Sequence, residues 1–132
     1  MTVQDLIPSG SLRHMLLPPT FGLHATQAAE FTVLSVEVWT TGIVINIQVA
    51  SANGKSLPEI AVEDHQGTEY SLHGSATVGS RNLQVFTPTV PPGTRSLTIR
   101  STDGGRLVVT FAVPPLRKAD ALAPQEDLPK AG

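Results

Sequence analysis

The side chains best suited to acid–base or metal chemistry are four histidines, His14, His24, His65 and His73. A histidine changes charge near neutral pH and is the commonest metal ligand, so converging histidines would indicate a catalytic or metal site. His14 and His24 match no zinc-ligand spacing. His65 and His73 fall at opposite ends of one expected strand, too far apart to share a metal ion. We therefore expect surface or interface histidines, with no metal site and no cofactor.

The carboxylates give no catalytic pair either. Glu63 and Asp64 are adjacent, and neighbouring side chains on a strand point to opposite faces. Asp64 is better explained as a turn residue that accepts hydrogen bonds from its own backbone. Glu59 would share a face with Glu63, and we expect that face to be solvated. The sequence also lacks the D-x-D-x-D-G pattern of a calcium loop.

Motifs that activate a nucleophile or cradle a phosphate are missing from the sequence. The chain has no cysteine, which removes thiolate chemistry and cysteine-ligated metals. It has no G-x-S-x-G nucleophile elbow. Residues 74–80 are rich in glycine and serine but lack the Gly-Lys-Ser/Thr ending of a phosphate-binding loop. Together these exclusions predict that the chain is not an enzyme by itself.

The charge and hydropathy of the chain argue against nucleic acid and membrane as partners. Nine basic and 11 acidic residues give a formal net charge of −2, and the longest basic run is Arg117-Lys118. Nucleic-acid binding needs a clustered basic face, so we expect no nucleic-acid partner. The apolar runs are too short to cross a membrane, and the first residues lack the pattern of a secretory signal. We predict no membrane span and a cytoplasmic location.

Proline divides the chain of 132 residues, a length that fits one domain, into three parts. Only four of the 11 prolines lie within residues 30–113. Because proline interrupts both ladders and helices, the flanks are expected to be extended or irregular. The predicted organisation is a proline-containing apolar N-terminal arm (1–29), a β-sandwich domain (30–113), and an extended or disordered C-terminal tail (114–132).

The central part has the two-residue period of strands with one buried face. Ile43, Ile45, Ile47 and Val49 share one face of a strand. In residues 31–39 the apolar phase switches, which indicates a bulge or a strand buried on both faces. The same period recurs around 60–63, 70–72, 83–85, 97–99 and 107–113. About seven strands with a turn signal about every 8–12 residues predict an all-β fold, an immunoglobulin-like antiparallel β-sandwich with extended N- and C-terminal arms.

Turn glycines, a proline-rich connection and core aromatics carry a family resemblance. In these framework residues the chain resembles a group of small uncharacterised bacterial proteins with an immunoglobulin-like β-sandwich. The resemblance implies the fold and supplies no activity, and the chain lacks the inter-sheet cysteine pair of antibody domains. The residues concerned are Trp39 and Gly42; Asp64, Gly67, Thr68 and Tyr70; and Phe86, Pro88, Pro91, Pro92, Gly93, Leu97 and Ile99.

The N-terminal arm is unusually apolar for a flank. A disordered tail is normally poor in large apolar residues, and burying one Leu or Phe contributes about 1.5–3 kcal/mol. The arm would therefore cover an open edge of its own sandwich, dock on another subunit, or remain disordered. We predict that its large apolar residues bind a partner: Leu6, Ile7, Met15, Leu16, Leu17 and Phe21.

These inferences favour a non-catalytic structural or interaction protein. It would be an accessory subunit of a larger complex or of a self-assembling particle, docked through its arms to a protein partner or to its own copies. One alternative is a ligand-binding module that uses end loops 51–58 and 73–80. A second alternative is an enzyme whose site forms between subunits, with His24 or His73 from one chain and a carboxylate from the next.

Overall fold

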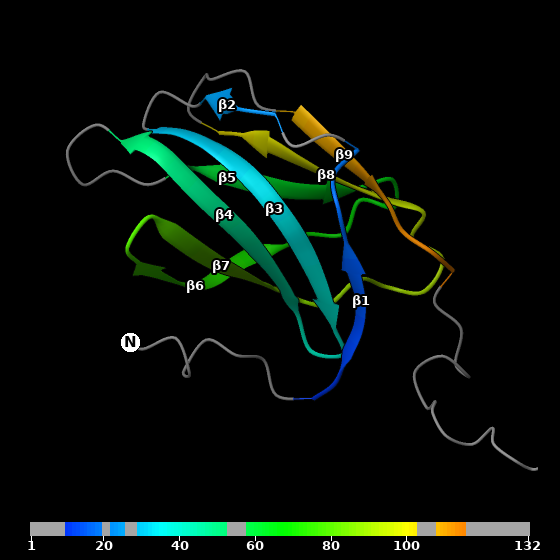
Figure 1. Ribbon diagram of the computed structural model, residues 1–132. Helices are drawn as coiled ribbons and strands as arrows, with labels where there is room; N and C mark the ends of the chain where they lie inside the picture. The colour runs from blue at the N-terminus through cyan, green and yellow to red at the C-terminus, as the bar shows by residue number, and fades with distance from the viewer. Residues whose placement is uncertain (1–9, 20–21, 26–28, 53–57, 103–107, 116–132) are drawn as a thin grey trace, which may run out of the picture.

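A computed structural model describes residues 10–19, 22–25, 29–52, 58–102 and 108–115 (Figure 1). These residues contain strands and turns but no helix, which confirms the all-β prediction. The strands are β1 (Leu12–Leu16), β2 (His24–Ala25), β3 (Ala29–Trp39), β4 (Ile43–Ala52), β5 (Ile60–Asp64), β6 (Ser71–Val78), β7 (Arg81–Thr87), β8 (Ser96–Ser101) and β9 (Val108–Ala112).

The strands form two antiparallel sheets (Figure 1). The first sheet has the order β1-β3-β4-β7-β6, and β2 pairs with β3 next to β1. The second sheet has the order β5-β8-β9. One apolar cluster draws side chains from both sheets, including Phe31 and Ile45 from the first and Leu97 and Phe111 from the second. The seven expected strands correspond to β3–β9, and the two sheets pack as the layers of a sandwich.

The alternation on β4 is confirmed by burial. Ile43, Ile45 and Ile47 are fully buried between the sheets, as the two-residue period predicts. The phase switch in β3 is confirmed as a bulge, because the register with β4 shifts between Val33 and Ser35. This extra residue allows Val33 and Val36 both to face the core.

The set of β7 side chains that points to the core is not the one that the sequence predicts. The period predicts that Leu83 and Val85 face the core, but Ile45 pairs with Gln84. Directly opposed residues share a face, so Gln84 and its strand neighbour Asn82 lie on the core side. Leu83 and Val85 lie on the outer face of the first sheet, where they cluster with further apolar residues: Val44, Trp39 and Ala76.

The turn between β3 and β4 is held by its backbone. Trp39 N donates to Gly42 O at 2.8 Å, which closes a two-residue hairpin loop. Gly42 does not have the left-handed conformation expected of it, because its φ is not positive. A Cβ at this position would lie 2.9 Å from the carbonyl oxygen of Phe86, so glycine is needed for a close approach of two backbones.

The N-terminal boundary of the folded part lies earlier than the proline pattern predicts. Leu12–Leu16 and His24–Ala25, both within the expected arm 1–29, pair with β3 as β1 and β2. This corresponds to the alternative in which the arm covers an edge of its own sandwich. Residues 1–9 and most of the predicted tail, residues 116–132, lie outside the described residues.

Residues of the family resemblance meet at one end of the molecule, where β5 leads into β6. The Asp64 carboxylate accepts hydrogen bonds from the Gln66 and Thr68 backbone nitrogens and from the Tyr70 hydroxyl, the last at 2.8 Å. Burial alone would raise the pKa of Asp64, but the hydrogen bonds from Thr68, Tyr70 and Gln66 outweigh it and hold the pKa below 3.8. Burial and the neighbouring Asp64 carboxylate raise the pKa of Tyr70. This network is a structural turn, as the sequence predicts for Asp64.

Candidate functional site

Two surfaces of the first sheet depart from the ordinary pattern of a soluble sandwich. The first, which we name the apolar edge, consists of Leu12, Met15, Leu17 and Leu23. These four side chains are between 46% and 61% exposed. Within the described residues, the other large apolar side chains with comparable exposure are Leu72 and Val78, both on β6 at the opposite edge of the sheet.

The apolar edge is fixed at its start by the β3–β4 turn. Thr40 N donates to Ser11 O at 2.8 Å, and Ser11 N donates to the Thr40 hydroxyl at 3.0 Å. Gly10, immediately before, has a φ of +102°, and a Cβ there would collide with the Thr40 hydroxyl. The chain therefore needs glycine at this position to bring β1 against the turn.

Beyond Leu12, β1 is attached less firmly to β3. Its register with β3 shifts between Leu12 and His14, so Arg13 is bulged. Arg13 Nε and His14 Nε2 are buried without a hydrogen-bond partner. A buried polar group left unpaired costs about 1–3 kcal/mol, which weakens the attachment of β1 to the sheet. Within the described residues, no strand pairs with the other side of β1.

The structure separates the predicted partner-binding residues into three groups. Met15 and Leu17 are exposed, as a docking role requires. Leu16 is only 5% exposed and packs in the core, because it lies opposite the inward-facing Val36. Leu16 therefore stabilises its own sandwich and is not accessible to a partner. The remaining three, Leu6, Ile7 and Phe21, lie outside the described residues.

Sequence reasoning missed two members of the apolar edge. Leu12 and Leu23 were not selected, although they lie in the same apolar flank as Met15 and Leu17. The available signal was the two-residue period of β1, which places Leu12 and Met15 on one face once the bulge at Arg13 is included. That bulge is not visible in the residue types.

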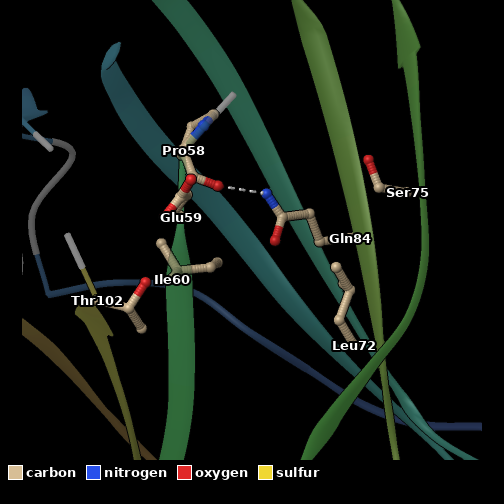
Figure 2. A pocket seen from close by; sticks show the side chains of 7 residues that line it. All are labelled: Pro58, Glu59, Ile60, Leu72, Ser75, Gln84 and Thr102. Carbon is tan, nitrogen blue, oxygen red and sulfur yellow. Dashed lines mark hydrogen bonds between the residues drawn. The ribbon is translucent and has the colours of Figure 1, made fainter. Parts of the chain in front are cut away.

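The second surface is a groove where the two sheets have unequal width. The first sheet continues past β4 to β7 and β6, whereas the second sheet ends at β5. A cavity of about 430 Å³ lies between β5 and the inner face of β6 and β7 (Figure 2). We name it the β5–β6 groove, and it is lined by Pro58, Glu59, Ile60, Leu72, Ser75, Gln84 and Thr102.

Two buried amides occupy the inner end of the groove. Gln84 is 4% exposed and Asn82 is fully buried. Gln84 Nε2 donates to Pro58 O at 3.0 Å and to Asn82 Oδ1 at 2.9 Å, linking the sheets across the core. Asn82 Nδ2 in turn contacts three acceptors from β6: Ser75 Oγ, Ala76 O and Thr77 Oγ1.

The β5–β6 groove involves part of the loops that the sequence nominates for ligand binding. Pro58 ends the predicted loop 51–58, and Ser75 lies within the predicted loop 73–80. The structure corrects the bounds of both predicted loops, because Ser51 and Ala52 end β4 and residues 73–78 belong to β6. Residues 53–57 lie outside the described residues.

The four histidines lie on four different segments, and His14, on β1, has its Nε2 buried without a hydrogen-bond partner. His65 Nε2 accepts a hydrogen bond from Arg95 N at 3.0 Å. His24 packs its ring against Phe31, and burial lowers the pKa of His24. His73 is the bulged residue of β6. In the part of the chain that the structure describes, no group of three or more His, Cys, Asp or Glu residues is placed to hold a metal ion.

Glu63 lies on the outer face of the second sheet, where its carboxylate pairs with Arg100 at 2.7 Å. Both partners are about half exposed, so the pair contributes little to stability. Among the described residues, there is also no helix with the length and hydropathy needed to cross a membrane.

Comparisons with protein-family models, with curated proteins and with solved structures found no match to the chain. The two surfaces therefore have to be interpreted from their own geometry.

Proposed function

We propose that the protein is a non-catalytic interaction protein that docks through the apolar edge, either on a protein partner or on its own copies. The observation that carries the proposal is the exposure of Leu12, Met15, Leu17 and Leu23 along one edge of the first sheet. Large exposed apolar side chains that are grouped on one part of a surface mark an interaction site more often than scattered ones do.

Energetics indicate how such a partner would bind. Covering the exposed part of each of the four side chains contributes on the order of 1–2 kcal/mol. Association itself costs about 4–15 kcal/mol, so the side chains alone compensate only the lower end of that range. A stable complex therefore needs further contacts. The unpaired side of β1 offers backbone N–H and C=O groups for them, and strand addition at such an edge is a common mode of docking.

An immunoglobulin-like classification belongs to this proposal. Two packed antiparallel sheets and a shared apolar core support it. The ladder order supports it as well: counted from β3, the orders β3-β4-β7-β6 and β5-β8-β9 correspond to the ABED and CFG sheets of an immunoglobulin constant domain, with β1 and β2 added beside β3. The likeness therefore extends from the architecture to the strand order.

Matched single substitutions test the docking proposal. Leu17 and Val78 are both 61% exposed but lie at opposite edges of the first sheet. We expect Leu17→Ser to reduce the native mass of the assembly, measured by light scattering on protein purified gently from its source cells, whereas Val78→Ser leaves it unchanged. Both variants should keep the stability of the parent to within about 0.5 kcal/mol. An equal mass for all three proteins would refute the proposal.

A further inference from the structure

The β5–β6 groove lies beside a sheet edge with free backbone groups. Thr102 N donates to Glu59 O at 3.0 Å, so the backbone groups of Glu59 face β8. Along an antiparallel strand these groups alternate between the two sides. Those of Ile60 and Val62 therefore point away from β8, toward the groove side. In the described residues no strand pairs with this side of β5.

The inner face of β6 lacks an opposing strand in the described part of the chain. The second sheet has three strands, fewer than the first. A fourth strand placed beside β5 would lie over Leu72 and Ser75 of β6. Leu72 is 54% exposed in the absence of such a strand, although it is paired with the buried Phe86. The groove thus has the position and the backbone partners for one more strand.

The hydrogen-bonding character of the groove is set by Gln84. Both hydrogens of its amide nitrogen are used, one by Pro58 O and the other by Asn82 Oδ1. Reversing the amide would bring its oxygen against these two acceptors, so the orientation is determined by the network. Figure 2 shows the Gln84 oxygen turned away from Pro58, toward the space between Ile60 and Leu72. The groove therefore presents an acceptor.

The charge of the groove lining also favours a ligand that donates hydrogen bonds. Glu59 is the charged residue of the groove lining, at the exposed rim because it alternates with the inward-facing Ile60, and none of the lining residues is Lys or Arg. Apart from Gln84, the other polar side chains in the lining are the hydroxyls of Ser75 and Thr102. A side chain with several donors and a positive charge complements an amide oxygen and a carboxylate. The apolar walls formed by Ile60 and Leu72 suit the methylene stem of such a side chain.

We propose that the β5–β6 groove binds an extended segment of a partner protein, which adds to the free edge of β5 as a fourth strand and inserts a Lys or Arg side chain toward Gln84. The segment pairs its backbone with Ile60 and Val62. Main-chain hydrogen bonds give such complexes affinity, and the pocket gives the preference for a basic side chain. This site is separate from the apolar edge, which lies at the other side of the first sheet.

Three blocked pentapeptides test the proposal on the isotope-labelled full-length chain: Thr-Val-Lys-Val-Thr, the same peptide with Glu for Lys, and the same peptide with backbone N-methyl-Lys for Lys. We expect the Lys peptide to shift the amide signals of Ile60, Val62 and Leu72 and to slow exchange of the Ile60 and Val62 amides. The Glu and N-methyl-Lys peptides should bind at least about tenfold more weakly, since one lacks the donor charge and the other lacks the N–H of the inward-facing residue, which faces β5 when the segment pairs antiparallel with Ile60 and Val62.

Two protein variants test whether the peptide binds in the groove. Leu72→Lys adds a positive charge to the groove at an exposed position, and we expect it to weaken binding of the Lys peptide by about tenfold. Val78→Lys is the matched control on the same strand, outside the groove lining, and should leave the affinity unchanged. Leu17→Ser should also bind the peptide normally, which separates this proposal from docking at the apolar edge.

Three outcomes would overturn the proposal. One is the absence of saturable shifts for the Lys peptide at about 1 mM. Another is equal binding of the N-methyl-Lys peptide, because strand addition requires the backbone donor that faces β5. The third is the same set of shifts on concentrating the protein without peptide, which would make a second copy of the chain the occupant.

Discussion

The two edges of the first sheet show how one sheet can be left open in two different ways. At the β1 edge, Leu16 packs inward and its neighbours Met15 and Leu17 remain exposed. At the β6 edge, the strand is longer and its inner face lies beyond the end of the second sheet, next to polar Asn82 and Gln84. The first edge therefore exposes apolar side chains. The second offers a polar groove and a neighbouring row of backbone groups.

This comparison depends first on the position of Leu16. We expect Leu16→Asp to lower the free energy of unfolding by about 3 kcal/mol, because it removes a core side chain and buries a charge. Leu17→Asp, one residue later, should change it by less than about 0.5 kcal/mol. Urea unfolding followed by the fluorescence of Trp39, the single tryptophan, measures both. Equal effects of the two substitutions would mean that β1 does not hold its place on the sheet.

The polar interior beside β6 provides the second test. We expect Asn82→Ala to lower the free energy of unfolding by about 2 kcal/mol, because Gln84 Nε2 and several acceptors on β6 lose a buried partner. Gln48→Ala is the matched control, since the Gln48 amide is also hydrogen-bonded but exposed. It should cost less than about 0.5 kcal/mol. A cost as small for Asn82→Ala would show that the groove side is not held by these amides.

The connection from β5 to β6 gives the smallest expected effect and a dependence on pH. We expect Asp64→Asn to cost about 1 kcal/mol at neutral pH, because the Tyr70 hydroxyl loses its charged acceptor. The folded pKa of Asp64 is lowered, so its carboxylate stabilises the fold fully above the ordinary value of 3.8. That contribution is lost as the pH falls through the folded pKa.

Urea unfolding of the parent and of Asp64→Asn at several pH values measures this difference. The gap between the two proteins should close as the solution becomes acidic. Glu63→Gln serves as the control, because the exposed ion pair of Glu63 with Arg100 contributes little. A gap that stays constant with pH would show that the charge of Asp64 does not take part in joining β5 to β6.

Local periodicity predicted those features that depend on neighbouring residues. The isoleucines of β4 had one apolar face, and burial confirms it. The phase switch in β3 indicated a bulge, and the register shift after Val33 confirms it. Asp64 was assigned to a turn, and its hydrogen bonds to Gln66 and Thr68 show why.

Features that depend on pairing between distant strands could not be predicted. The period of β7 separates Leu83 and Val85 from Asn82 and Gln84 but does not reveal which set faces inward. Only the pairing with β4 settles that question. The groove depends on the relative width of two sheets, which no local pattern encodes. β1 was assigned to an arm because nearby prolines, Pro18 and Pro19, outweighed its short and bulged pattern.

The position of β5 in the strand order has a consequence for the order in which the strands pair during folding. Strands β3 and β4, β6 and β7, and β8 and β9 are consecutive partners, so each pair closes over a short stretch of chain. The ladder partner of β5 is β8, which follows it only after β6 and β7. Because closing a longer loop has a larger entropic cost, we expect β5 to pair with β8 only after the hairpins have formed, as we expect of β4 and β7, which are equally distant along the chain. The rim that completes the groove would then form after the hairpins, and under native conditions it would be the first part of the second sheet to open.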